Sequence, residues 1–449
     1  MSIPPRCDVA IIGGGPAGSM AAAYLARAGY HVVVVDKQHH PRYAVGESLI
    51  PDFWRYCDEA GVAAAVEAEG FVRKAGGLVA WQGTLRRVAF KDFGYTRPAL
   101  HVERDRFDQL LLDNSRSLGA QVVEGVAVHH VEFGPEAETG GKAGVRLCLR
   151  AVDGGEETEL TCRYVIDASG QAAVIGRRLG LRHMDENFRF MSVWGYFDGS
   201  DYLTPTGDIH PAQEVSRIPP ATFVTSLGPE HNWGWSWHIM LRHTTSVGLV
   251  IPVDTVKSVK ESETGWEDFF LHQCETLPIL SRLLEPARFV PGSVRLTRHY
   301  AYRSSAVAGP GFFLTGDGAG FIDPIFSVGV VLALYSGRAA AWAVERCLQA
   351  PDRAADTRSL YTHQLQGRLD LARTLALPNY GLDEPQTLAT AQRMAQFAGG
   401  AVQSLMYGAA LLVNRGPNVD AIFADAQVRN YARARIPTLP ELALAPSSS

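Results

Sequence analysis

The segment at residues 13–18, which reads GGGPAG, constrains the fold of this chain more than any other feature. It follows an apolar run at 8–12 and precedes a stretch of small and apolar residues at 19–28 that ends at Gly29. A β-branched run at 31–35 then leads to Asp36, eighteen residues beyond Gly18. A strand, a GxGxxG turn, a helix and a second strand with an acidic end are typical of a dinucleotide-binding βαβ unit.

The residue types of this unit suit a pyrophosphate and a ribose. Glycines let backbone N–H groups approach the phosphates, and the helix N-terminus adds partial positive charge. An acidic residue at the end of the second strand accepts hydrogen bonds from the ribose diol. The pattern by itself does not distinguish FAD from NAD, and a plain βαβ turn also uses glycine for packing. The residues expected at the dinucleotide are Gly13, Gly15, Ala17, Gly18, Asp36 and Lys37.

The rest of the chain alternates between two styles. The strand and helix pattern continues in segments 105–119, 121–124, 145–150, 159–167 and 311–314. Helix dominates from residue 329 onward. Residues 188–252 contain tryptophans, alternating segments and turn signals, which predict an antiparallel sheet. We therefore expect a discontinuous dinucleotide domain at 1–75, 100–185 and 290–350. A sheet-based substrate domain is expected at 76–99 and 186–289, and a helical C-terminal region at 351–449.

Composition excludes several classes of protein. The 449 residues carry a formal net charge of −5, so no basic excess indicates nucleic acid or an anionic membrane as a partner. The apolar stretches 329–344 and 397–413 are interrupted by Arg338 and Gln403, which favours buried helices over membrane spans, and the N-terminus lacks the features of a signal peptide. Six scattered cysteines without a CxxC pair predict neither disulfides nor a metal site and suit a reducing cytoplasm.

Two further turns extend the dinucleotide pattern. Residues 165–170 read VIDASG and residues 314–320 read LTGDGAG, each a strand that leads into small residues. In this order, with the N-terminal fingerprint, they resemble the FAD domain of aromatic hydroxylases. The resemblance implies an α/β fold with a discontinuous Rossmann-like FAD-binding domain, an antiparallel β-sheet substrate domain and a helical C-terminal region. It implies that Asp317 holds the ribityl chain and that Arg104 contacts the flavin nucleotide.

Four segments resemble motifs of flavin-dependent halogenases. They are GESLIP at 46–51, FVRKAG at 71–76, WSWHIM at 235–240 and FIDPIFSVG at 321–329. The similarity runs in order from residue 8 to about 345 and is greatest to the branch that acts on pyrroles and phenols, often on a carrier protein. Met240 departs from this family's pattern, because a proline ends the tryptophan motif there.

The resemblance assigns roles to these motifs. Lys74 is the expected catalytic residue, since a desolvated lysine has a lowered pKa and can bind hypohalous acid or form a haloamine. The backbone amides of Ser327, Val328 and Gly329 would hold a halide ion beside the flavin. Trp235 and Trp237 would line the wall between flavin and substrate; together with Trp233 they also suit core packing of a strand. Additional flavin contacts are expected from Ser48, Gly329 and Val330.

The resemblance also implies a reaction. Reduced FAD and O₂ give a C4a-hydroperoxide, halide attack gives hypohalous acid, and a tunnel leads this acid to Lys74 and an electron-rich aromatic substrate. That substrate is free, carrier-bound or peptide-bound, and a partner flavin reductase supplies reduced FAD, because no second fingerprint occurs.

The alternative is a monooxygenase on the same frame that hydroxylates a small phenol, or a peptide tryptophan in quinone-cofactor maturation; Met240 favours it. A non-catalytic FAD protein is a third possibility. No spacing selects a catalytic histidine among His101, His183, His231, His238 and His243, and the oligomeric state stays open.

Overall fold

The computed structural model describes residues 3–81, 84–142, 144–227, 234–256, 259, 265–298 and 300–376. Three features considered from the sequence lie outside these ranges, namely His231, Trp233 and the part of the helical C-terminal region beyond residue 376.

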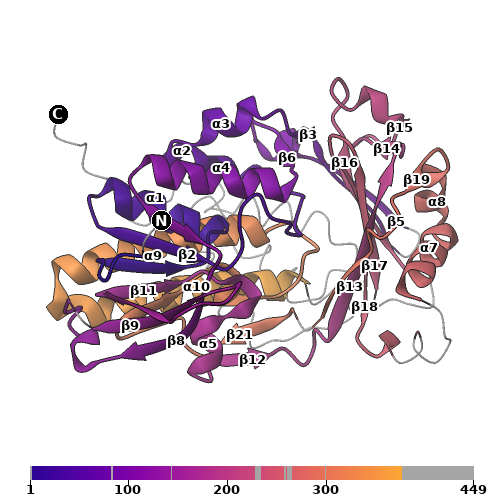
Figure 1. Ribbon diagram of the computed structural model, residues 1–449. Helices are drawn as coiled ribbons and strands as arrows, with labels where there is room; N and C mark the ends of the chain where they lie inside the picture. The colour runs from indigo at the N-terminus through magenta and orange to yellow at the C-terminus, as the bar shows by residue number, and fades with distance from the viewer. Residues whose placement is uncertain are drawn as a thin grey trace.

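A six-stranded sheet forms the first half of the molecule, in the order β22-β23-β11-β1-β2-β7 (Figure 1). All its pairs are parallel except β22–β23. Every residue of the strands β1 and β2 is buried, as a parallel sheet covered on both faces requires. The bounds are β1 (Val9–Ile12), β2 (Val32–Asp36), β7 (Gln121–Glu124), β11 (Tyr164–Asp167), β22 (Ala308–Gly309) and β23 (Phe312–Leu314).

Helices pack closely around this sheet because small residues let their backbones approach. A Cβ at Gly337 of helix α9 would lie 2.1 Å from the carbonyl oxygen of Ala17 in helix α1, so only glycine fits there. Ser336 accepts a hydrogen bond from the Gly316 N–H at 2.8 Å and ties α9 to the third glycine turn. The bounds are α1 (Pro16–Arg27), α2 (Phe53–Ala60), α3 (Ala63–Ala68), α4 (Arg104–Ser117), α5 (Val174–Arg178), α9 (Gly329–Gln349) and α10 (Ala354–Ala376).

An eight-stranded sheet forms the second half, with β19-β13-β18-β17-β16-β4-β5 in order and β20 paired to β13. The predicted antiparallel pairing over 188–252 is present in β13, β16, β17 and β18, whereas β16 and β4 run parallel. The helices α7 (Trp266–Thr276) and α8 (Pro278–Leu284) cover its outer face (Figure 1). The bounds are β4 (Gly76–Trp81), β5 (Thr84–Ala89), β13 (Phe190–Asp198), β16 (Ala221–Ser226), β17 (Trp235–Met240), β18 (Thr245–Pro252), β19 (Arg288–Phe289) and β20 (Arg295–Arg298).

Smaller sheets connect the two halves. One three-stranded sheet has the order β10-β9-β8, and a second, β12-β21-β24, lies beside it toward the large sheet (Figure 1). The pair β3–β6 leads from the first half into the second, and β14–β15 packs beside β16 of the large sheet (Figure 1). The bounds are β3 (Val72–Lys74), β6 (Ala99–His101), β8 (Val126–Phe133), β9 (Val145–Ala151), β10 (Thr158–Cys162), β12 (Arg182–Met184), β14 (Tyr202–Leu203), β15 (Ile209–His210), β21 (Tyr302–Ser304) and β24 (Gly320–Phe321).

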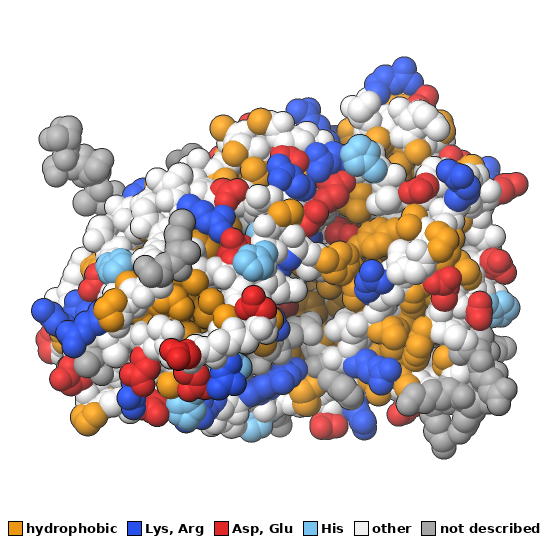
Figure 2. Space-filling model, viewed as in Figure 1, with side chains coloured by type: hydrophobic (Ala, Val, Ile, Leu, Met, Phe, Trp, Pro, Cys, Tyr) orange, Lys and Arg blue, Asp and Glu red, His pale blue; other side chains and the backbone are white. Residues whose placement is uncertain are grey.

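The predicted fold class is confirmed, with a Rossmann-like parallel sheet beside a large, mostly antiparallel sheet. The exact division into domains stays a prediction. Within the described ranges, no helix is long and apolar enough to cross a membrane. Hydrophobic side chains gather along the hollow between the two halves, which is where the functional site lies (Figure 2).

Candidate active site

A cavity of about 780 Å³ lies between the six-stranded and the eight-stranded sheet. Both sheets and the loop at 42–48 contribute to its wall. Three residues that the sequence placed at the site do not line this cavity, namely Gly18, Lys74 and Val328. Those that do are Gly13, Gly15, Ala17, Asp36, Lys37, Ser48, Arg104, Trp235, Trp237, Asp317, Ser327, Gly329 and Val330.

The three glycines of the fingerprint are required by different features of the structure. Gly13 has φ +103°, and a Cβ there would lie 2.4 Å from the carbonyl oxygen of Ala168. A Cβ on Gly18 would lie 1.9 Å from the Gly13 oxygen, so Gly18 serves the close packing of helix on strand. Gly15 has ordinary backbone angles, and a Cβ there would meet only the Arg42 guanidinium at 3.1 Å. The space above Gly15 therefore forms a cradle at the start of α1.

Asp36 closes this cradle on one side. Its Oδ2 accepts a hydrogen bond from the Gly14 N–H at 2.7 Å, and its Oδ1 accepts one from the Gln38 N–H at 2.8 Å. Its side chain also lines the cavity, where a carboxylate has further lone pairs for hydroxyl groups. A helix N-terminus, an open glycine cradle and a carboxylate acceptor fit the pyrophosphate and ribose of a dinucleotide.

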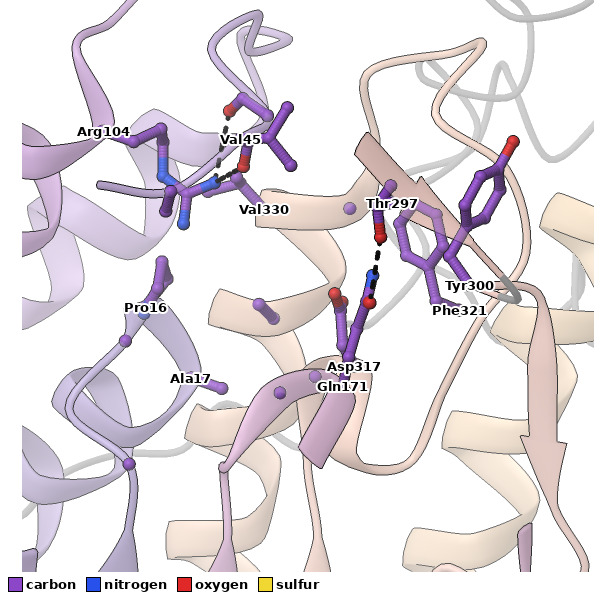
Figure 3. A pocket seen from close by; sticks show the side chains of 18 of the residues that line it. Pro16, Ala17, Val45, Arg104, Gln171, Thr297, Tyr300, Asp317, Phe321 and Val330 are labelled. Atoms are coloured by element: carbon purple, nitrogen blue, oxygen red, sulfur yellow. Dashed lines mark hydrogen bonds between the residues drawn. The ribbon is translucent and has the colours of Figure 1, made fainter. Parts of the chain in front are cut away.

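Arg104 holds the loop at 42–48 in place. Its guanidinium donates to both oxygens of Asp108, at 2.8 and 3.0 Å, and to the Val45 carbonyl oxygen at 2.6 Å (Figure 3). Arg42 donates to the same buried carboxylate at 3.1 Å and lies beside the Gly15 cradle. Arg42 belongs to none of the motifs, although a basic residue shortly after the acidic end of the second strand is a usable signal.

Asp317 lines the cavity at one end, in the turn between β23 and β24, where the neighbouring Gly316 packs against Ala17 of α1. Burial raises the pKa of Asp317 to about 6, and the positive charge of Arg104 partly opposes this shift. Figure 3 shows Asp317 close to Gln171, whose Oε1 accepts a hydrogen bond from the Thr297 hydroxyl at 3.5 Å. This end therefore offers carboxylate, amide and hydroxyl groups, which suit a polyol chain.

Lys74 and Ser327, which are far apart in sequence, meet at Ser48. The Lys74 Nζ donates to the Ser48 Oγ at 2.8 Å and to the Leu49 carbonyl oxygen at 3.0 Å. The Ser327 hydroxyl donates to the same Ser48 Oγ at 3.0 Å. The Lys74 side chain is 1% exposed, and this burial lowers its pKa to about 7. Lys74 thus contacts the cavity wall through Ser48.

Ser327 occupies an unusual backbone conformation at the start of α9. Its φ is +58°, in the left-handed region that few residues other than glycine adopt. Val328 is the N-cap of the 21-residue helix, and Gly329 is its first residue. The N–H groups of a first helical turn have no carbonyl partner within the helix, so this turn presents donors and partial positive charge beside the cavity.

The Ser48 hydroxyl is also hydrogen-bonded to a buried polar pair that the sequence did not reveal. It lies 2.8 Å from the Thr222 Oγ1, which lies 2.8 Å from His101 Nε2. His101 Nδ1 lies 2.9 Å from the Met240 carbonyl oxygen. No local signal distinguished Thr222 within its strand, and no spacing distinguished His101 from the other histidines.

Glu47 is a second buried ionisable group that the sequence analysis missed. Its Oε1 accepts a hydrogen bond from the Tyr196 hydroxyl at 2.7 Å, and the Tyr196 and Tyr43 hydroxyls are 2.9 Å apart. Burial raises the pKa of Glu47 to about 7. Its position before Ser48 in the GESLIP segment was the available signal.

Trp235 and Trp237 lie on the cavity face of β17. Their ring centroids are 5.8 Å apart, and Trp194 of β13 lies 6.5 Å from Trp237. The Trp237 indole lies over Gly248 of β18, where a Cβ would come within 2.2 Å of the ring. The two tryptophans therefore do both things considered from the sequence: they pack in the core and they line the cavity.

Comparison with known proteins agrees with this geometry. The family described as "FAD binding domain" matches residues 6–359. The tryptophan 2-halogenase of Chondromyces crocatus is 33% identical over 369 residues, which are 82% of this chain and 66% of that protein, so the chain spans just under two thirds of this relative. The 1H-pyrrole-2-carbonyl-[peptidyl-carrier protein] chlorinase of Pseudomonas fluorescens is 33% identical over 379 residues, 79% of each protein.

Solved structures give the same result. The myxobacterial chondrochloren halogenase CndH has a TM-score of 0.75 and 26% identity, covering 97% of this chain and 92% of that one. The flavin-dependent halogenase CmlS has a TM-score of 0.74 and 28% identity, covering 95% and 76%. The FAD-binding family matches most of the chain, the alignment with the chlorinase covers 79% of both proteins, and the fold is shared with solved halogenases. The chain therefore belongs to the flavin-dependent halogenases, within the FAD-binding flavoproteins.

Proposed function

We propose that this protein is an FAD-dependent halogenase that transfers electrophilic halogen to an electron-rich aromatic ring. One observation supports this proposal above the others. The buried Lys74 amine and the Ser327 hydroxyl both donate hydrogen bonds to Ser48, which lines the cavity. The relatives act on tryptophan and on a carrier-bound pyrrole by their names, which supports an aromatic substrate.

The chain's own residues would hold FAD along the cavity. Gly13, Gly15 and the start of α1 would hold the pyrophosphate, Asp36 the ribose, and Asp317 the ribityl chain. Bound FAD in its reduced form supplies the activation of O₂ that turns a halide ion into an electrophile. The sequence carries one dinucleotide fingerprint, so we propose that a separate reductase delivers the reduced flavin.

The turn at Ser327, Val328 and Gly329 would bind the halide. Its backbone amides and the N-terminus of α9 favour an anion, and the left-handed conformation of Ser327 shapes the turn. This site would hold the halide at the cavity wall, next to the Ser48 hydroxyl that contacts Lys74.

Lys74 would present the electrophilic halogen to the substrate. Burial lowers its pKa to about 7, so a large share of the side chain is neutral amine near neutral pH. A neutral amine has a lone pair that can accept halogen from hypohalous acid, whereas an ammonium group can only donate hydrogen bonds. Holding the halogen on one atom confines a reagent that would otherwise react indiscriminately.

Trp235 and Trp237 would shape the substrate side of the cavity with Trp194. Their rigid aromatic faces suit a flat aromatic ring, either of a small molecule or of a group carried on a protein. The six cysteines are unpaired, which suits the reducing cytoplasm as the place of action.

One experiment decides the reaction type. Purified protein is supplied with reduced FAD, O₂ and chloride or bromide over a panel of phenols, pyrroles and carrier-bound aromatic groups, and products are identified by mass spectrometry. Replacement of a ring hydrogen by halogen is expected. Halide-independent gain of one oxygen atom would overturn the proposal in favour of a monooxygenase.

A further inference from the structure

A continuous chain of hydrogen bonds leads from Lys74 into the protein interior. It runs from Lys74 Nζ to Ser48 Oγ at 2.8 Å, to Thr222 Oγ1 at 2.8 Å and to His101 Nε2 at 2.8 Å. It ends where His101 Nδ1 lies 2.9 Å from the Met240 carbonyl oxygen. All four residues are less than 9% exposed, and two of them, Ser48 and Thr222, also line the cavity.

The chemistry of the groups fixes the direction of every bond in this chain. A carbonyl oxygen can only accept, so His101 Nδ1 carries a proton and donates to Met240. Neutral His101 then has an unprotonated Nε2, which accepts from the Thr222 hydroxyl. Because Thr222 uses its proton on His101, its oxygen must accept from Ser48.

This direction leaves Ser48 with no further proton to give. Its single hydroxyl proton is directed to Thr222, and its oxygen accepts from Lys74 and from Ser327. A hydroxyl has one donor and two acceptor positions, so all are used. A proton that leaves Lys74 through Ser48 is therefore directed to Thr222 and His101, and not into the cavity.

We infer that His101 is the base that removes the proton of Lys74, through Ser48 and Thr222, and so generates the amine that takes up halogen. The inference rests on the proposed function, because it concerns how Lys74 is activated for that reaction. His101 is buried away from the cavity and acts through the two hydroxyls, so it is a positioning and proton-accepting residue that does not touch the substrate.

The proton balance closes over one turnover. The Lys74 ammonium gives a proton to Ser48, Ser48 gives its own to Thr222, and Thr222 gives its own to His101 Nε2. The amine attacks hypohalous acid, so an N–halogen bond forms, the O–halogen bond breaks, and the oxygen leaves as water with a proton from the nitrogen. The aromatic carbon then takes the halogen, the ring proton returns to the nitrogen, and the relay runs in reverse to restore the ammonium and neutral His101.

The surroundings keep His101 neutral before the transfer. Burial, assisted by the charge of Lys74, holds the pKa of His101 well below its usual range. The part of this shift that comes from Lys74 is relieved once Lys74 has lost its proton, so His101 accepts the proton transiently and returns it within the turnover. Burial lowers the pKa of His238 on β17 to about 4, so that side chain is neutral. Ionisable groups on adjoining segments include Glu47, Arg73, Glu103 and Arg242.

Variants of Thr222 test the relay. Thr222→Val removes the hydroxyl with little change of volume, Thr222→Ser keeps it, and Thr225→Val is the matched control on the outward face of the same strand. Bromination of phenol is measured from about pH 5.5 to 9 with reduced FAD, O₂ and bromide, alongside oxidation of the reduced FAD, which reports the flavin step separately.

The relay predicts a pH-dependent deficit. With the relay, a protonated Lys74 can pass its proton to His101 during turnover, so the rate does not depend only on the Lys74 that is already neutral. Without it, only the neutral amine already present reacts, and its share falls about tenfold for each pH unit below the pKa of Lys74. Thr222→Val should therefore lose bromination progressively below about pH 7 and approach the wild type above it. Thr222→Ser and Thr225→Val should follow the wild-type profile.

Other outcomes separate this inference from the proposed function. A deficit of equal size at every pH, or none, would overturn the relay while leaving the halogenase intact. Full bromination by Lys74→Ala would overturn the role of Lys74 and the relay with it. A measurement without cofactor adds an independent check: ¹⁵N shifts of His101 should show a protonated Nδ1 and a free Nε2, and a protonated Nε2 would overturn the relay whatever the reaction.

Discussion

At the scale of single residues, Lys74 has a stability disadvantage that its proposed chemistry explains. An ammonium group in an apolar interior is unfavourable unless it is paired, and within the described ranges no carboxylate pairs with Lys74. Its partners are a hydroxyl, a carbonyl oxygen and, 5.4 Å away, the ring of Phe90. A buried, weakly compensated lysine is a mark of a functional group and not of a structural one.

The first prediction concerns the reaction. Lys74→Ala should leave oxidation of reduced FAD by O₂ unchanged, because Lys74 does not line the cavity, while halogenation falls by orders of magnitude. Lys74→Arg should not restore halogenation, since a guanidinium stays protonated and offers no lone pair. Flavin absorbance and product mass spectrometry on the same samples measure both steps. Wild-type halogenation by Lys74→Ala would contradict the assignment.

The second prediction concerns stability and pH. The pKa of Lys74 falls from 10.5 to about 7 on folding, so its unfavourable contribution is absent above pH 10.5 and complete below about 7. Between these limits the destabilisation grows by about 1.4 kcal/mol for each pH unit lowered. Lys74→Met should therefore raise the unfolding temperature at pH 6 clearly more than at pH 9. Ser327→Ala, a substitution without a titrating group, serves as the control, and an equal gain at both pH values would exclude this explanation.

At the scale of elements, the βαβ unit shows how far a local pattern determines a site. The glycines of residues 13–18 and Asp36 are specified by short-range geometry, so the sequence alone located them. Gly15 and Gly18 look equivalent in the motif, yet only Gly18 is in steric contact with backbone.

The third prediction separates these two glycines. Gly15→Val should fold normally, since its backbone angles suit any residue and its Cβ meets only a flexible guanidinium, but its side chain would occupy the cradle and abolish FAD binding. Gly18→Ala should lower stability, because its Cβ overlaps the Gly13 carbonyl. Circular dichroism gives the stability and FAD titration the affinity. Normal FAD affinity in Gly15→Val would refute the placement of the pyrophosphate.

The fourth prediction concerns the pairing of β17 with β18. Trp237 lies opposite Gly248 in register, and its indole fills the space that a side chain would need. Gly248→Ala should displace the indole into the cavity, which raises KM for the aromatic substrate and changes tryptophan fluorescence. FAD affinity should stay as in the wild type if Trp237 belongs to the substrate side. An equal loss of FAD affinity would place Trp237 at the cofactor instead.

At the scale of the whole molecule, the sequence predicted the parts of the site better than their assembly. Ser48 and Ser327 were each expected from a motif, but their contact joins positions 279 residues apart. Thr222 meets His101 across 121 positions, and neither had a local signal. The Met240 backbone carbonyl, which lies 2.9 Å from His101 Nδ1, is a main-chain group that the identity of residue 240 could not reveal. Such contacts depend on how two sheets pack, which no single segment specifies.

The same packing leads to the last prediction. The cavity joins Gly13 and Asp317 of the six-stranded half to Thr222 and Val224 of the eight-stranded sheet, so FAD bound there should stabilise both halves together. A ligand that binds only the folded state adds about 2.7 kcal/mol at a concentration of 100 times Kd, and the gain grows with the logarithm of its concentration. The unfolding temperature should therefore rise with added FAD as a single transition. FMN lacks the adenosine ribose that Asp36 would bind, so at equal concentration it should give a much smaller rise. Two separate transitions, of which FAD shifts one, would show that the cofactor contacts only one sheet and would rule out a site shared between them.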